Sequence, residues 1–441
     1  MKKYLTLLAG AMFLTACYND ADDIASKDGY QPSTDAIAFE FNEDGVENSV
    51  TRASGAIYNN DALETKTIGV FASYTGKLKY ENTTVSPNFM WNQPLTCAGG
   101  NWDYNPAKYW PNGLAETPEY VSFFAYAPYE AAPGVGKCIT DISDNDLTGD
   151  PWVNYHLGQY PWPKDETGAD VSTLVDQVDL LYGMNDVNND GTVFKPWTDV
   201  SKYKDNGSIN IGIADKVKFT MKHALASIGN EITIKLTDGT GTNPSDNLAA
   251  LIADYSKIVI YGIKIEYKNL TTKARLVLNS ADGSANWKEV ISGELTTTRT
   301  YLNMFDAANV RTFTGKETTA ETKTQHIPYL NGPATATSTA PTDASTQGDG
   351  LFYIPMQIAG TEKAKATVTL YYRVNILADN SYIPAAPDFA EASATFELPI
   401  NDMAGKKQGL ALTLTQDYDL MHLVYTLGGT ATEPSYSRLT K

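Results

Sequence analysis

Residues 36–53 read Ala-Ile-Ala-Phe-Glu-Phe-Asn-Glu-Asp-Gly-Val-Glu-Asn-Ser-Val-Thr-Arg-Ala, and this stretch indicates how the chain is organised. Ile37, Phe39 and Phe41 alternate with small or acidic residues, a period of two that predicts a half-buried β-strand. A polar segment then leads to a lone basic residue, Arg52, which a trypsin-like protease could cut. A sheet that lost this strand would keep an open apolar groove and unpaired backbone groups for another chain to fill. An ordinary first strand followed by a solvated arginine is the simpler interpretation.

The first seventeen residues predict a lipoprotein signal peptide. Two lysines follow Met1, an apolar run of about eleven residues comes next, and Leu-Thr-Ala-Cys closes the segment at Cys17. The run is shorter than the roughly 18–20 residues that span a bilayer as a helix. Removal of residues 1–16 would leave Cys17 as the lipid-bearing first residue, and lipid as the only anchor in the outer membrane. An ordinary signal peptide with a chance cysteine is the alternative.

The composition limits the classes of partner. The formal net charge is −18, and no stripe of lysine or arginine offsets it, so nucleic acid is a poor candidate. A hydrophobic content of 42% with 11% aromatic residues is typical of a packed globular chain. Besides Cys17, the chain holds Cys97 and Cys138. In an extracellular setting these two could form a disulfide, and two separate thiols are equally open.

Short alternating segments separated by Gly, Asn, Asp and Pro dominate the chain, and they predict an all-β protein. Examples are residues 68–74, 120–126 and 216–222. One helix is expected near 245–255. Roughly fourteen or more strands are too many for one open sheet, so we expect two β-sandwich domains in tandem. The predicted division is a signal peptide at 1–16, a lipidated propeptide with the removable strand at 17–52, and domains at 53–230 and 231–441.

Residues that would carry catalysis are not arranged in any familiar motif. The four histidines are far apart in the sequence, and no zinc-protease, nucleophile-elbow or phosphate-loop motif occurs. His223 follows an alternating strand, which favours a packed or hydrogen-bonded side chain over a metal ligand. We therefore expect a protein that is not an enzyme and that needs no cofactor.

One segment imitates a calcium-binding loop. Asp186, Asn188, Asp190 and Gly191 match the first half of the D-x-N-x-D-G pattern. Trp197 stands where the bidentate glutamate belongs, and helical patterns do not flank the segment. A hairpin turn built on Asn-Asp-Gly is the better interpretation, so no metal site is expected.

An aromatic-rich region lies between two of the predicted strands. Its members could stack on sugar rings as a carbohydrate-binding surface, but aromatic residues between strands more often fill a sandwich core. We expect the core role for this group. The residues concerned are Trp91, Trp102, Tyr104, Tyr109 and Trp110.

Several short motifs, taken in order, resemble those of the Bacteroidales fimbrillins, the FimA- and Mfa-like lipoprotein pilins that build type V pili. The resemblance is strongest over residues 14–230 and thin in the carboxyl-terminal half. The features that carry it are Leu14-Thr15-Ala16-Cys17, the strand before Val50-Thr51-Arg52-Ala53, Trp102 with Tyr109-Trp110-Pro111, Val121-Ser122-Phe123-Phe124-Ala125-Tyr126-Ala127-Pro128, Asp179-Leu180-Leu181-Tyr182, and Phe219 through His223-Ala224-Leu225.

The resemblance implies transthyretin-like, Greek-key sandwiches and a mechanism of assembly. Such pilins are exported as lipoproteins to the outer membrane, and a trypsin-like, Arg-specific protease then cuts after an arginine, which by position is Arg52 before Ala53. The first strand leaves, and a neighbouring pilin subunit fills the groove with a carboxyl-terminal strand. The product is a surface fimbrium that adheres to host or bacterial surface glycans or proteins.

The donor strand is expected within residues 409–427. Two alternating sets occur there, one around Leu410–Leu414 and one nearer the end of the chain, which we favour. A plain last strand of the second domain is the alternative. For the whole protein, the alternative function is a monomeric glycan-binding or adhesive surface lipoprotein. The favoured donor residues are Met421, Leu423, Tyr425 and Leu427.

Overall fold

The structure is a computed structural model, and the part of the chain that it describes is nearly all β-strand. The described residues are 36–43, 60–76, 78, 80, 85–109, 120–158, 177–184, 198–199, 204–205, 208–209, 216–238, 257–280, 284–289, 296–304, 311–314, 322–325, 351–375, 390–400, 403–417, 420–429 and 432–438. Among them the helix is α2 (Asn60–Glu64), and it is too short to cross a membrane. The all-β prediction is confirmed, and the helix expected near 245–255 lies outside the described residues.

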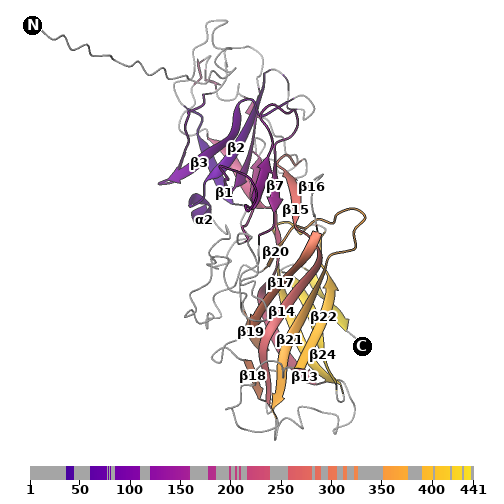
Figure 1. Ribbon diagram of the computed structural model, residues 1–441. Helices are drawn as coiled ribbons and strands as arrows, with labels where there is room; N and C mark the ends of the chain where they lie inside the picture. Colours follow the sequence, from indigo (N-terminus) through magenta and orange to yellow (C-terminus); the bar gives the residue numbers. More distant parts are fainter. Residues whose placement is uncertain are drawn as a thin grey trace, which may run out of the picture.

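An eight-stranded sheet forms the amino-terminal part of the molecule (Figure 1). β1 and β4 stand at the two ends of its strand order, and β9 pairs only with β5. The order is β1 (Phe39–Glu43), β12 (Val217–His223), β8 (Leu181–Met184), β5 (Tyr120–Ala127), β2 (Ile68–Gly76), β3 (Met90–Ala98) and β4 (Asn101–Asp103), with β9 (Thr198–Asp199) beside β5.

The central strands of this sheet are buried on both faces. On β5, Phe124 and Tyr126 face a large core, here called the central cluster, while Phe123 and Ala125 face a smaller one, here called the β1 cluster. Because successive side chains point to opposite faces, the near-continuous apolar run of β5 is what two covered faces require. The β1 cluster comprises Ile37, Phe39, Phe41, Leu63, Ile68, Val70, Ala72, Phe89, Met90, Leu95, Trp102, Val121, Phe123, Ala125, Ala127, Leu181, Val217, Phe219 and Met221.

A four-stranded sheet contributes to the central cluster from the other side. Its order is β16 (Asn286–Lys288), β15 (Lys273–Val277), β7 (Trp152–His156) and β6 (Ile139–Ile142). Val153, Tyr155 and Leu276 point into the central cluster from this sheet. Because β15 pairs antiparallel with β7 and β16 pairs with β15, residues 273–277 and 286–288 return to the amino-terminal sheets. The predicted division at residue 230 falls within one strand, Ala226–Asp238, and the two-domain division stays a prediction.

Two further sheets form the carboxyl-terminal part of the molecule (Figure 1). Side chains of both, such as Val368 and Leu412, also belong to the central cluster. A separate two-stranded sheet joins β10 (Lys204–Asp205) and β11 (Ser208–Ile209). One of the two sheets has the order β19 (Thr322–Gln325), β13 (Ala226–Asp238), β23 (Lys407–Asp417), β24 (Leu420–Gly429) and β25 (Thr432–Arg438), with β20 (Leu351–Tyr353) beside β13; the other has the order β17 (Thr296–Met304), β14 (Lys257–Thr271), β21 (Lys365–Asn375) and β22 (Ala390–Glu397), with β18 (Arg311–Thr314) beside β14.

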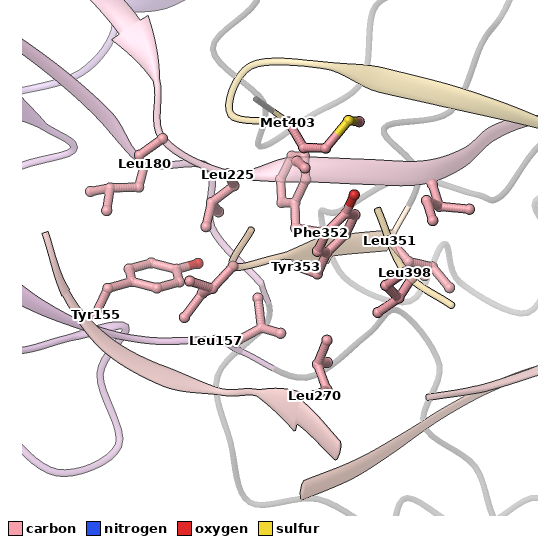
Figure 2. Close-up of a cluster of buried hydrophobic side chains, with 14 of the residues drawn as sticks. Tyr155, Leu157, Leu180, Leu225, Leu270, Leu351, Phe352, Tyr353, Leu398 and Met403 are labelled. Atoms are coloured by element: carbon pink, nitrogen blue, oxygen red, sulfur yellow. The ribbon is translucent and has the colours of Figure 1, made fainter. Parts of the chain in front are cut away.

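The central cluster is continuous from the amino-terminal sheets to the carboxyl-terminal ones. Figure 2 shows Tyr155 and Leu157 in the same buried cluster as the β20 residues Phe352 and Tyr353. The Phe352 N–H donates to Gln177 Oε1 at 2.9 Å, which ties β20 to the segment that leads into β8. Separating the amino-terminal sheets from the carboxyl-terminal ones would expose side chains of this shared cluster. Because losing the contacts of one large buried side chain costs about 2–5 kcal/mol, the cluster stabilises the association of the two parts.

Candidate functional site

The candidate site is the groove that β1 occupies at the end of the eight-stranded sheet. β1 pairs in parallel with β12, in the register Phe39 to Val217 and Phe41 to Phe219. Its other side contacts the segment after β4, where the Ile37 N–H donates to the Lys108 carbonyl at 2.8 Å. The strand therefore lies between two segments, with backbone partners on both sides.

Three apolar side chains of this segment fill the β1 cluster. Ile37, Phe39 and Phe41 are 1%, 1% and 4% exposed. The Phe41 ring stacks on Phe219 with centroids 4.7 Å apart and meets Trp102 edge-on at 5.0 Å. Aromatic pairs at such distances add roughly 0.5–1.5 kcal/mol beyond the area that they bury. The phenylalanines are thus specific contacts as well as a hydrophobic filling.

The opposite face of β1 is polar. Glu40 is half-buried and Asn42 is exposed, and the Asn42 amide donates to Glu40 Oε1 at 3.2 Å. A slip of one residue in register would turn the phenylalanines outward and the glutamate inward. The amphipathic pattern therefore favours a single register of the strand.

Tyr104 contacts the start of the segment through its hydroxyl group. The hydroxyl donates to the Ile37 carbonyl at 2.9 Å, and it also lies 3.2 Å from the Lys108 carbonyl oxygen. Burial raises the pKa of Tyr104 to about 12, so the phenol is protonated and can donate at neutral pH. The Tyr104 ring also meets Phe39 edge-on at 5.4 Å.

Without β1, the remaining surface would be an apolar slot with an unpaired strand edge. Its lining would include Phe123, Val217 and Phe219, which are buried in the β1 cluster while the strand is in place. β12 would offer the N–H and C=O groups that now pair with β1. Such a slot accepts an extended segment with apolar side chains at every second position.

The sequence and the fold were compared with those of known proteins. No protein-family model matches the chain. A fimbrium subunit, Fim1C of Phocaeicola vulgatus, is 29% identical over 160 residues, which are 34% of this chain and 40% of that protein. The chain thus matches less than half of the length of this curated relative. The crystal structure of a fimbrial protein from Bacteroides vulgatus shares the fold at a TM-score of 0.51 and 16% identity, covering 90% of this chain and 99% of that one.

These matches support the resemblance of the chain to the Bacteroidales fimbrillin family. Both of the proteins matched are fimbrial proteins, one similar in sequence over part of the chain and the other similar in fold. The residues predicted for lipidation and cleavage, namely Cys17, Arg52 and Ala53, lie outside the described residues.

The residues predicted for the donor strand lie in β24 (Leu420–Gly429). This strand pairs on one side with β23, in the register Leu423 to Leu414 and Tyr425 to Leu412. On its other side it pairs with β25. Met421 and Leu427 belong to the β23 ladder too, so the whole set is part of the chain's own sheet.

Cys97 and Cys138 do not form a disulfide. Cys97 packs against the β1 cluster, and Cys138 is buried in the central cluster. These clusters lie on opposite faces of the eight-stranded sheet, so the sheet itself separates the thiols. Of the two alternatives that the sequence left open, the structure has the separate thiols.

The aromatic group divides between the core and the surface. Trp102 is buried and Tyr104 contacts β1, as the core interpretation expects. Trp91 is 45% exposed and Tyr109 is 41% exposed, so these two are surface residues. Trp110 lies outside the described residues, as does the calcium-like segment 186–197.

His223 is hydrogen-bonded, as the sequence indicated. Its Nδ1 lies 2.9 Å from Oδ2 of the buried Asp179, which joins the end of β12 to the segment before β8. Within the described ranges, no group of three or more His, Cys, Asp or Glu side chains could hold a metal ion. Sequence reasoning did not identify Asp179 as the partner, because the two residues are 44 positions apart.

Proposed function

We propose that this chain is a structural pilin. It is exported as a lipoprotein, carries lipid on Cys17, is cut after Arg52 by a trypsin-like protease and polymerises by strand exchange with other pilin subunits. The resulting surface fimbriae serve adhesion to host or bacterial surfaces. The fimbrial relatives support the coarser part of this proposal, and they support a structural role over an enzymatic one.

The main support for the proposal is the burial of the apolar face of β1 in its groove. Burying the three apolar side chains Ile37, Phe39 and Phe41 stabilises the contact by about 1.5–3 kcal/mol each. Dissociation of the strand would therefore expose an apolar slot to water, which is unfavourable in free energy. A strand from a second subunit with the same alternation would cover this slot again, with backbone hydrogen bonds worth roughly 0.5–1.5 kcal/mol each.

The position of Arg52 fits the removal of this strand. Arg52 follows Glu43, the last residue of β1, by nine positions, and α2 begins at Asn60. A cut between Arg52 and Ala53 would leave β1 attached to the sheet by noncovalent contacts alone. A cut at Lys27, on the other side of β1, would leave the strand covalently joined to the body.

The donor proposed is the carboxyl-terminal segment that contains β24. Because β24 lies between β23 and β25, it leaves its sheet only if its ladder with β23 breaks. β25 is the last strand in the order, so the β24–β25 hairpin would detach as one unit. Its alternating apolar residues would then occupy the slot that β1 had filled.

The test is limited proteolysis of the protein that lacks residues 1–16. We expect low-dose trypsin to give a stable product that begins at Ala53 and forms ladders on non-boiled gels. Arg52→Ala should remain monomeric, whereas the matched variant Lys27→Ala should assemble like the parent. Normal fibres from Arg52→Ala would refute the processing step.

The monomeric alternative is tested in the same experiment. Trp91 and Tyr109 are exposed, which is the observation that a glycan-binding surface would need. If this alternative holds, the trypsin product stays monomeric and binds polysaccharide, and Trp91→Ala weakens that binding. Ladders of increasing length would instead favour the pilin.

A further inference from the structure

A pocket with both polar and apolar lining residues lies on the four-stranded sheet, away from β1. Its volume is about 310 Å3, which is near the lower limit for small-ligand sites. Trp152 on β7 and Arg275 on β15 alternate with residues of the central cluster, so they face outward from that core. The lining includes Ser143, Asp150, Trp152, Arg275, Lys288 and Glu289.

Arg275 lies over the ring of Trp152. The guanidinium carbon lies 3.5 Å from the centroid of the indole ring, and the Nε–H donates to Asn154 Oδ1 at 3.0 Å. Both contacts follow from the register of β7 and β15, which pairs Arg275 with Asn154 and Val277 with Trp152. Among the described residues, the terminal N–H groups of Arg275 have no hydrogen-bond acceptor. A fixed planar donor is thus presented at the pocket.

Two carboxylates are fixed at the same pocket. Asp150 Oδ1 accepts from the Tyr80 hydroxyl at 3.0 Å and from Asn279 Nδ2 at 2.8 Å. Glu289 Oε1 accepts from the Ala359 N–H at 2.6 Å. Contacts with the surrounding chain therefore hold both groups in place before any ligand arrives, which lowers the entropy cost of binding.

The pocket lining holds two basic and two acidic side chains. Arg275 and Lys288 face each other in the ladder of β15 and β16, and they stand against the carboxylates of Asp150 and Glu289. The two carboxylates would repel an anionic ligand, and the two basic groups would repel a cationic ligand. A neutral hydroxyl both donates and accepts, so adjacent hydroxyls suit this mixture of groups.

We propose that this pocket binds a neutral sugar unit. Adjacent hydroxyls would accept from Arg275 and Lys288 and donate to Asp150 and Glu289, while Leu147 at the rim would contact the apolar face of the ring. Trp91, whose indole N–H donates to the Ser143 carbonyl at 2.7 Å, lies beside the pocket and is exposed. It extends the surface toward the next sugar of an oligosaccharide.

The test uses the protein that lacks residues 1–16, with β1 intact. The probes are the methyl glycosides of galactose, mannose, fucose and N-acetylglucosamine, with glucuronate and N-acetylneuraminate as acidic probes. Saturation-transfer NMR and tryptophan fluorescence follow binding. We expect saturable binding of at least one neutral glycoside, weakened at least tenfold by Arg275→Lys, which keeps the charge but loses the flat fork.

Further variants guard against a loss of binding through misfolding. Lys288→Ala changes an exposed side chain and should also weaken binding, whereas Lys363→Ala and Tyr109→Ala, outside the pocket, should not. Circular dichroism checks that each variant is folded. The proposal is overturned if no neutral probe binds at 10 mM (about the weakest affinity of interest), if only acidic probes bind, or if Lys288→Ala binds like the parent. These outcomes do not depend on strand exchange, since β1 stays in place.

Discussion

Replacing Phe41 with alanine should weaken the attachment of β1 to the sheet far more than a change on the other face of the same strand. Phe41 is 4% exposed and stacks on Phe219 at 4.7 Å. Phe→Ala changes at such sites cost about 3–5 kcal/mol. The dissociation constant of the cut strand should therefore rise roughly 150- to 5,000-fold. The matched control is Glu40→Ala on the polar face, which should change the free energy by no more than about 0.5 kcal/mol.

The assay measures this attachment directly. The protein lacking residues 1–16 carries a fluorophore at its amino terminus and the change Lys27→Ala, which removes the trypsin site between the label and β1, and it is cut with low-dose trypsin at Arg52. Fluorescence polarisation then follows release of the labelled segment when excess unlabelled peptide 17–52 is added. Equal release from Phe41→Ala and Glu40→Ala would refute the reasoning, because it would mean that the buried ring does not hold the strand.

Three further predictions concern the same body of the protein. Tyr104→Phe removes the hydroxyl that donates to β1, so it should speed release of the cut segment about 2- to 13-fold, for a loss of roughly 0.5–1.5 kcal/mol. Because the pKa of Tyr104 is raised to about 12, its contribution is complete below pH 10 and is lost as the pH rises toward 12; the difference between parent and Tyr104→Phe in denaturant unfolding should shrink over that range. Gly69→Ala should lower stability by about 1–3 kcal/mol in thermal unfolding, because the added Cβ would lie too close to a buried tyrosine ring, whereas Gly134→Ala, with open space, should not. Dithiothreitol should leave the melting temperature unchanged, because the two described cysteines form no disulfide.

Local patterns predicted the all-β class and the apolar face of β1. The alternation of Ile37, Phe39 and Phe41 requires only that successive side chains of a strand point to opposite faces, which is a property of the backbone itself. The structure places all three in one buried cluster. Whether the two ends of the chain are separate sandwich domains, and whether β1 is removed, are not decided by that alternation and stay predictions.

The pairing of the strands was beyond what the sequence could specify. Phe39 pairs with Val217, and Lys273 with His156, across more than a hundred positions in each case. The sugar pocket depends on the second of these ladders, because it brings Arg275 onto Trp152. No motif predicted it, since each residue taken alone looks like an ordinary surface side chain.

Residue order by itself thus determined that this protein is built of strands, and which side of its first strand is apolar. Tertiary structure decided which strands are neighbours, where the thiols lie and what the first strand covers. The physical reason is that side-chain alternation is local, whereas ladder hydrogen bonds join backbone groups that are chemically alike in every strand. The choice among partners is made only when all the apolar faces are buried together.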